Sequence, residues 1–288
     1  MLKKLGVIFL VTSISVLLSS CHIKQKDVET IKRTTENLRV YQPNDFIVYN
    51  VTALTNSATP SRGTLRIEWD TTADLLDPID NTTQYRVLKE TTTLTYEEDS
   101  IETGATIIRY ISQDTDGNIT LYAIDDGLLR YWLHDPDDTG NLSANISTPV
   151  IFNSPVTITS NPPVHFTAME GCVSGSCKSE IYTFGDNVEI VGDTTEVTTN
   201  LGKFSDPFQI NFSGESTANG ASTVSVVGDI RTACGTSMDN ISYTGTMFVV
   251  PEIGIVQMTN LCQNPTDSQV QYIITIDNTN IPLPAPTP

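Results

Sequence analysis

Few side chains in this sequence combine the residue types and spacing that enzymes use for catalysis. The three histidines are His22, His134 and His165, and no HExxH metal motif, GxSxG nucleophile turn, SxxK motif or glycine-rich phosphate loop is present. Glu97 and Glu98 form an adjacent carboxylate pair, but such pairs are expected by chance in a chain with 34 Asp and Glu residues. We therefore expect solvated loop histidines, no catalytic residues and no cofactor.

Two acidic loops have a composition that suits calcium. The segments Asp114-Thr-Asp-Gly-Asn118 and Asp135-Pro-Asp-Asp-Thr-Gly-Asn141 concentrate carboxylate and amide oxygens, which are the ligands that calcium prefers. Neither has the full EF-hand pattern, and Asp, Asn and Gly also favour ordinary β-turns. We expect solvated turns and no metal. The alternative is a calcium site with ligands from Asp114, Asp116, Asp135, Asp137 and Asp138.

Residues 1–20 have the pattern of a signal peptide. Lys3 and Lys4 give a positive start, an apolar run follows over residues 5–18, and small residues come next. The run is too short, and too often interrupted by hydroxyl side chains, for a membrane span of about 20 residues. We expect these residues to be removed on export.

The segment Leu18-Ser-Ser-Cys21 resembles the bacterial lipobox. The resemblance implies cleavage just before Cys21 and acylation of its thiol, so that the chain is held on a membrane through acyl chains. In enteric-type sorting an Asp after the cysteine retains the protein at the inner membrane. This sequence has His22, which implies the outer membrane, with the body facing the periplasm or the cell surface. The alternative is ordinary secretion with an incidental cysteine.

The other four cysteines are an even number in an exported chain, which favours disulfides. Cys172 and Cys177 are separated by Val-Ser-Gly-Ser, a flexible segment that allows them to pair, and Cys234 is then left with Cys262. Four thiolates could instead bind zinc, but the four-residue gap is wider than usual and an oxidising compartment consumes free thiols. A redox pair lacks the CxxC spacing.

Composition indicates a folded, strongly acidic protein. Of the 288 residues, 39% are hydrophobic, which is enough to form a core. The net charge is −18, and becomes −20 when residues 1–20 are removed with their two lysines. Nucleic acid is excluded as a partner because no patch of Lys and Arg is available to bind phosphate.

From Tyr41 onward, alternating β-branched and aromatic residues separated by turn signals predict strands. The predicted strands in the second half of the chain include residues 155–159, 180–184, 187–192 and 222–227. The clearest stretch is residues 106–133, where Asp-Gly turns separate three segments that should pair as consecutive antiparallel strands. No helical period is sustained after residue 40. The expected class is all-β, with curved antiparallel sheets that form a sandwich or a partly open barrel.

The expected organisation follows from these patterns. Residues 1–20 are the signal and 21–40 a lipidated polar tether, with a net charge of +2 over 22–40 and room for one or two helical turns. Residues 41–281 form one β-rich domain, with a possible subdivision near 135–148. The tail, 282–288, has proline at every second position and should be extended and exposed.

Several segments resemble those of uncharacterised bacterial lipoproteins. They are an early Tyr41-Gln-Pro43, a mid-chain Asp126-Gly-Leu-Leu-Arg-Tyr131, the element Thr246-Met-Phe-Val-Val-Pro-Glu-Ile-Gly-Ile-Val-Gln257 and a closing strand Gln271-Tyr-Ile-Ile-Thr-Ile276. The sequence departs from that family in lacking a Gly-x-x-Trp near the first strand and in having four additional cysteines. The resemblance implies a curved antiparallel β architecture and no established activity.

Two functions fit these observations. The first is a membrane-anchored, non-catalytic module of the cell envelope that scaffolds or binds an envelope protein, glycan or lipid. The alternative is a carrier that holds an apolar ligand, such as a lipid, in a cavity of the curved sheet.

Overall fold

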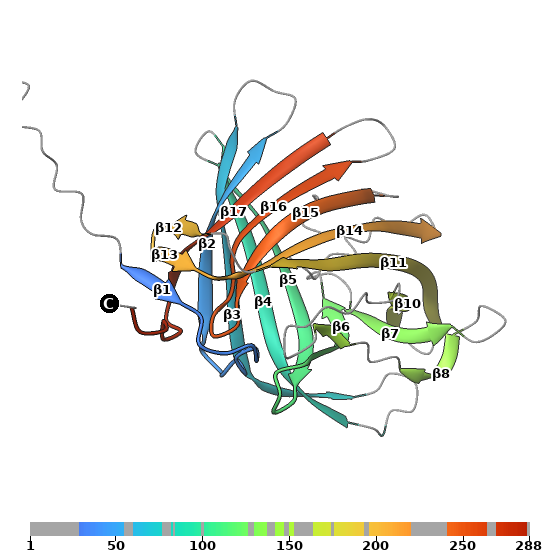
Figure 1. The fold of residues 1–288 in the computed structure, drawn as a ribbon. Helices are drawn as coiled ribbons and strands as arrows, with labels where there is room; N and C mark the ends of the chain where they lie inside the picture. Colours follow the sequence, from blue (N-terminus) through green and yellow to red (C-terminus); the bar gives the residue numbers. More distant parts are fainter. Residues whose placement is uncertain are drawn as a thin grey trace, which may run out of the picture.

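The computed structural model describes residues 29–54, 60–76, 82, 84–98, 101–125, 130–136, 142–146, 150–152, 164–173, 176–192, 196–219, 241–263 and 269–286. All regular secondary structure in these ranges is β-strand (Figure 1), so the all-β prediction is confirmed. Among the same residues we find no apolar helix of membrane-spanning length. Cys21, Cys234, Asp137 and Asp138 lie outside the described residues.

Seventeen strands are assigned within the described ranges. In chain order they are β1 (Thr30–Lys32), β2 (Phe46–Leu54), β3 (Ser61–Leu76), β4 (Gln84–Glu98), β5 (Ile101–Gln113), β6 (Ile119–Asp125), β7 (Arg130–Pro136), β8 (Leu142–Ile146), β9 (Val150–Phe152), β10 (Val164–Val173), β11 (Ser176–Gly192), β12 (Val197–Thr199), β13 (Gly202–Ser205), β14 (Phe208–Asn219), β15 (Ile241–Val250), β16 (Gly254–Gln263) and β17 (Gln269–Thr279).

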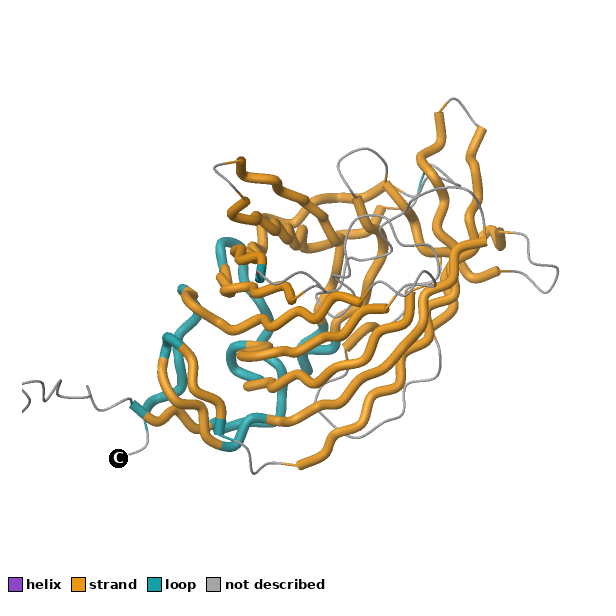
Figure 2. The backbone as a smooth tube through the Cα atoms, turned by 90° about the horizontal axis from the view of Figure 1, so that it is seen from above, coloured by secondary structure: helices purple, strands orange, loops and turns teal. Residues whose placement is uncertain are grey.

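One large antiparallel sheet dominates the molecule. Its strand order is β8-β7-β10-β11-β14-β15-β16-β17-β2-β3-β4-β5-β6-β9, with an additional pairing between β7 and β6. The sheet curls strongly in Figures 1 and 2 without closing into a regular barrel, since β6 and β7 share only three residue pairs. The three consecutive strands expected over 106–133 are β5, β6 and β7, and their antiparallel pairing is confirmed.

Two strand predictions need correction or stay open. Residues 180–184 and 187–192 were expected as separate strands, but both belong to β11, which passes through Gly185 and Asp186 while pairing with β14. These two residues suggest a turn in the sequence, yet in a sheet their backbone groups can continue the ladder. The expected strands at 155–159 and 222–227 lie outside the described residues, and the subdivision near 135–148 falls largely outside them.

The tether expected over residues 21–40 is shorter than predicted, because residues 29–40 belong to the folded body. Thr30–Lys32 forms β1, rather than a linker or a helical turn, and pairs in parallel with β13 in a small second sheet with β12. Ile31 is 3% exposed and Leu38 8% exposed, so both enter the core. Composition predicted a linker because only these few apolar residues interrupt a polar segment.

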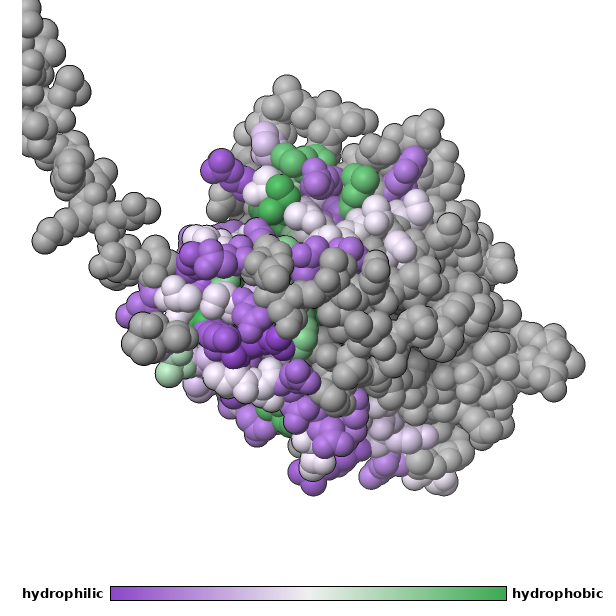
Figure 3. All heavy atoms as spheres, viewed as in Figure 1, coloured by the Kyte–Doolittle hydropathy of each residue, from purple (hydrophilic) through white to green (hydrophobic). Residues whose placement is uncertain are grey.

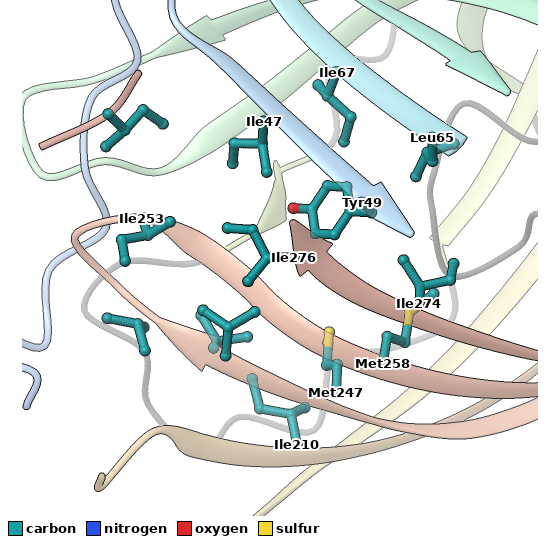
Figure 4. Close-up of a cluster of buried hydrophobic side chains, with 14 of the residues drawn as sticks. Ile47, Tyr49, Leu65, Ile67, Ile210, Met247, Ile253, Met258, Ile274 and Ile276 are labelled. Carbon is teal, nitrogen blue, oxygen red and sulfur yellow. The ribbon is translucent and has the colours of Figure 1, made fainter. Parts of the chain in front are cut away.

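The main core lies on the inner face of the curved sheet. Alternate residues of β2 and β3 point inward, including Ile47, Tyr49, Leu65 and Ile67, and all are buried. They pack with inward residues of β14, β15, β16 and β17, which lie on the other side of β2 in the sheet (Figure 4). These residues include Ile210, Met247, Met258, Ile274 and Ile276. This period of two is what the sequence pattern predicted.

A register shift in β3 creates a second, smaller core cluster. The pairing of Asp70 with Lys89 is followed by that of Ala73 with Val87, so β3 contains one extra residue there. Because one extra residue reverses which side chains face inward, Leu75 packs with Val87 and Tyr110 in a separate cluster. The bulge therefore lets one long strand contribute to both clusters.

The end of the chain lies beside its start. Ile281 is 2% exposed, Leu283 is 37% exposed, and Pro286 forms an isolated bridge with Ile31. The described part of the tail is mostly exposed and lacks strand pairing beyond that bridge, as the prolines predicted.

Candidate functional site

The most elaborate set of contacts among the described residues fastens the N-terminal segment to the sheet. We call residues 29–45 the strap. It crosses the turn between β15 and β16, residues 251–253, and each of these three residues accepts a hydrogen bond from the strap. Pro251 accepts a hydrogen bond from the Arg39 backbone N–H (2.8 Å), and the Ile253 carbonyl accepts one from the Tyr41 hydroxyl (3.2 Å).

Glu252 binds the strap most directly. Its Oε1 accepts hydrogen bonds from the Thr34 backbone N–H, from the Thr34 hydroxyl (2.7 Å) and from the Thr35 backbone N–H (3.1 Å). One carboxylate oxygen thus binds three donors from residues more than 200 positions earlier in the chain. Hydrogen bonds to a charged acceptor are about twice as strong as neutral ones. We call this set of contacts with residues 251–253 the clasp.

The Tyr41 ring lies flat against Trp69. The ring centroids are 3.8 Å apart and the planes are within 6° of parallel. Gly254 makes room for this ring: a Cβ there would lie 2.6 Å from the Tyr41 hydroxyl oxygen, and its φ of +120° is unfavourable for other residues. Two segments of the lipoprotein resemblance, Tyr41-Gln-Pro43 and the element ending at Gln257, therefore meet in space.

A turn in the strap sets the direction of Tyr41. The Asp45 N–H donates to the Gln42 carbonyl (3.0 Å), Pro43 stands at the second position, and Asn44 has a φ of +72°, which is the pattern of a type II turn. Asp45 Oδ2 accepts from the Gln42 N–H (2.9 Å) across the turn, and also from Arg39 Nε (3.2 Å) and Nη2 (3.1 Å). The Tyr-x-Pro pattern thus has a structural explanation.

A buried carboxylate lies beneath the stacked rings. Glu90 is 2% exposed, and its Oε2 accepts from the Trp69 indole N–H (3.1 Å). Its Oε1 accepts from Arg109 Nε (2.6 Å) and forms an ion pair with Arg109 Nη2. Both oxygens are therefore engaged, which buried charges require. The pKa of the Tyr41 hydroxyl lies well above its usual range, mainly because the group is buried and secondly because Glu90 is nearby.

The strap also reaches the hairpin between β5 and β6. The Gln113 side-chain oxygen accepts from the Tyr41 N–H (2.8 Å), and its nitrogen donates to the Arg39 carbonyl (3.2 Å). In the hairpin, Asp114 Oδ1 accepts from the N–H groups of Asp116 (3.0 Å) and Asn118 (2.9 Å). The Asn118 side chain is the main cause that lowers the pKa of Asp114, and these backbone donors add to it.

The calcium candidates do not gather in the described structure. Asp114 caps its own turn, and Asp116 is exposed beside it. Asp135 lies on β7, whereas Asp137 and Asp138 are outside the described residues. Within the part of the chain that the structure describes, no three His, Cys, Asp or Glu side chains are placed to hold a metal ion.

The cysteine predictions stay predictions. Cys172 is the second-last residue of β10 and Cys177 the second residue of β11, and Val173 pairs with Ser176 between them. This register places the two cysteines on either side of one hairpin end. Cys262 lies on β16, but its expected partner Cys234 is outside the described residues, as is the acylation candidate Cys21.

Sequence reasoning missed the importance of Trp69, Glu90 and Arg109. A signal was available, since Glu90 alternates in register with Leu88 and Leu94 and so shares their inward face. A charged residue on such a face needs a partner of opposite charge, and Arg109 lies directly opposite Glu90 on β5. The clasp had no comparable signal.

Comparison with known proteins finds only solved structures of weak similarity. No protein-family model and no curated protein matches the chain. One similar solved structure is a candidate exported protein with a YmcC-like fold from Bacteroides fragilis, with 13% identity, a TM-score of 0.39 and coverage of 85% of this chain and 99% of that one.

Another is a candidate lipoprotein from Parabacteroides distasonis, with 9% identity, a TM-score of 0.38 and coverage of 89% of this chain and 100% of that one. Backbones that agree this weakly do not assign the chain to a family.

Proposed function

We propose that this chain is a lipid-anchored, non-catalytic module of the bacterial cell envelope, held at the outer membrane through Cys21, that scaffolds or binds an envelope protein, glycan or lipid. The observation that carries the proposal is the clasp. The strap begins eight residues after the lipobox cysteine and is fastened to a turn more than 200 residues away. Such a connection suits an anchor point, because it ties the lipidated end to the rigid sheet.

The anchoring chemistry itself is favourable. Each buried methylene of an acyl chain contributes about 0.8 kcal/mol, so two or three chains hold a folded domain stably on a bilayer. Export also agrees with the expected disulfides, which persist outside the cytoplasm.

The absence of catalysis is part of the proposal, and the state of Glu90 supports it. A general acid or base needs to reach a substrate proton, whereas both oxygens of Glu90 are occupied by Trp69 and Arg109. The Tyr41 ring covers Trp69 from the strap side. These contacts give the buried Glu90 carboxylate a structural role.

The carrier alternative requires an apolar cavity, and the described core gives it no support. Residues that line a cavity large enough for a lipid would keep accessible surface. Met247, Met258 and Ile274, which face the interior from three neighbouring strands, are each at most 1% exposed (Figure 4). Side chains fill the interior around these three residues, so we favour the scaffold function.

The test is the chemical state of the mature N terminus. Mass spectrometry of protein extracted from membranes should show an acylated Cys21 as the first residue, and Cys21→Ser should release the protein from the membrane fraction. His22→Ala is the matched control, because it leaves the thiol in place and should stay membrane-bound. An unmodified Cys21, or cleavage elsewhere, would overturn the anchor.

Localisation and partner need separate experiments. In a host with enteric-type sorting, His22→Asp should move the protein from the outer to the inner membrane. Crosslinking of the anchored protein in intact cells, followed by separate analysis for protein, glycan and lipid adducts, would identify the partner class. Turnover of an envelope glycan by the purified protein would overturn the non-catalytic assignment.

A further inference from the structure

We infer that one particular end of the body faces the bilayer and contacts its lipid headgroups; this inference rests on the acylation of Cys21 proposed above. We call this surface the anchor end, and it consists of β1, the β12–β13 hairpin (residues 196–206) and the tail 281–286. These segments are neighbours: β1 pairs with β13, and Ile31 bridges to Pro286. Figure 1 shows them together beside the C terminus.

The short length of chain between Cys21 and Glu29, which we call the leash, is the first argument for this orientation. Only eight peptide steps separate Cys21 from Glu29, so that even a fully extended leash reaches about 26–29 Å. Glu29 is itself fixed, because its carbonyl accepts a hydrogen bond from the Lys203 N–H (3.0 Å). A tether that continued to residue 40, as expected from composition, would reach more than twice as far and would leave the orientation open.

The distribution of charge is the second argument for this orientation. The anchor end contains Lys32 and Lys203 against Glu196 and Asp206, a net charge of zero. The mature chain carries −20, so all of this net charge belongs to the rest of the molecule. Anionic headgroups repel a charge most strongly within about one Debye length, roughly 8 Å at physiological salt. The least repulsive orientation therefore turns the anchor end toward the lipid.

The surface chemistry decides the kind of contact. The side chains of Lys32 and Glu196 are 56% and 54% exposed, and the coloured residues around the strap are mainly hydrophilic in Figure 3. Leu283 is exposed at the same end. A surface of this kind contacts headgroups and does not enter the hydrocarbon.

The opposite end of the sheet is correspondingly distant. β16 begins at Gly254, directly after the turn that contacts the strap, and its tenth residue is the exposed Gln263. Ten residues of strand span about 30 Å. Gln263 should therefore stand well above the bilayer when Leu283 lies near it.

The experiment measures energy transfer from two positions to the membrane. The full-length, acylated protein carries a donor dye on a genetically encoded azide side chain at position 283 or 263, in vesicles of phosphatidylethanolamine and phosphatidylglycerol with an acceptor-labelled lipid. We expect at least twofold more efficient transfer from 283 than from 263. Equal transfer, or more efficient transfer from 263, in protein that floats with the vesicles would overturn the orientation while leaving the anchor intact.

A leash variant provides the control. Insertion of ten Gly and Ser residues between residues 28 and 29 should bring the transfer ratio close to one without releasing the protein from the vesicles. An unchanged ratio would contradict control by the leash. Failure of the parent protein to float would overturn acylation itself, and is thus distinguishable from failure of the orientation.

Discussion

The clasp and the β5–β6 hairpin both use a carboxylate to bind backbone N–H groups, but over very different chain distances. In the hairpin, Asp114 accepts from residues two and four positions away. In the clasp, Glu252 accepts from Thr34 and Thr35, 218 and 217 positions away. A local turn needs only its own few residues, whereas the clasp exists only after most of the sheet has assembled. Substitutions at the strap end should therefore affect global stability, and those in the hairpin only its own turn.

The largest expected effect is at the buried ion pair below the strap. Glu90→Ala leaves Arg109 without its carboxylate partner and Trp69 without an acceptor, so we expect a loss of about 3–5 kcal/mol in the free energy of unfolding. Urea denaturation measures this as a lower midpoint at an unchanged m-value.

A matched control for this substitution lies on the neighbouring strand. Glu68 pairs with Arg66 on the solvent-facing side of β3, where both side chains are more than 40% exposed, so Glu68→Ala should cost no more than about 1 kcal/mol. Midpoint shifts of equal size for the two variants would contradict a structural role for Glu90.

The contact between Gly254 and Tyr41 predicts a coupled pair of substitutions. Gly254→Ala should destabilise the protein by about 2 kcal/mol or more, because the new Cβ meets the Tyr41 hydroxyl and the φ is strained. Tyr41→Phe should cost about 1 kcal/mol through loss of the bond to Ile253.

In the double variant the oxygen that causes the collision is gone, and only the backbone strain is left. The combined loss should therefore be smaller than the sum of the single losses, by about 0.5–2 kcal/mol in a double-mutant cycle. Strict additivity would show that Gly254 is needed for its φ alone and not to accommodate the tyrosine.

The same contrast between local and distant contacts explains what the sequence could predict. The β5–β6–β7 strands were predictable because alternation and Asp-Gly turns act within about ten residues. The exposure found over residues 282–286 was predictable for a similar reason, since proline limits its own backbone. β1 was missed because a three-residue strand with one buried side chain, Ile31, has almost no periodic signal of its own.

The candidate site shows more clearly that contacts between distant segments cannot be predicted from local sequence patterns. Tyr41-Gln-Pro43 and the element around Gly254 could be recognised separately, but nothing in either indicates that they touch. Their contact depends on the strand order, which places β15, β16, β17, β2 and β3 side by side. Glu90 and Arg109 lay within reach of sequence reasoning, since each alternates with apolar residues, whereas the partners of Glu252 depend on the path of the strap.

Alkaline pH provides a smaller test of the strap end. Burial raises the pKa of Tyr41 and of Tyr49 in the folded protein, so in the unfolded chain both ionise near pH 10 while the folded forms stay neutral. Each therefore contributes stability that is present below pH 10 and is lost as the pH rises above it, at up to about 1.4 kcal/mol per pH unit.

Tyr41→Phe removes one of these two groups. Its free energy of unfolding, measured by urea titration from pH 8 to 11, should fall less steeply above pH 10 than that of the parent protein. Parallel curves for the two proteins would mean that Tyr41 ionises in the folded state and is reached by solvent.

The smallest expected effect is in the β5–β6 hairpin, and it completes the contrast with the clasp. Asp114→Asn removes the charge that binds the N–H groups of Asp116 and Asn118, so hydrogen exchange at these two amides should accelerate while the global urea midpoint changes little. Asp116→Asn, at an exposed position of the same turn, is the control and should leave both amides protected.

The pH dependence of the parent protein tests the same turn. Because the pKa of Asp114 is lowered, the stabilisation that its carboxylate gives the turn is present above the usual carboxyl range and is lost as the pH falls through the lowered value. The amides of Asp116 and Asn118 should therefore lose protection on acidification. A large drop in the global midpoint for Asp114→Asn would show that the hairpin, through Gln113, supports the strap as strongly as the clasp does, and the division between local and distant carboxylates would then fail.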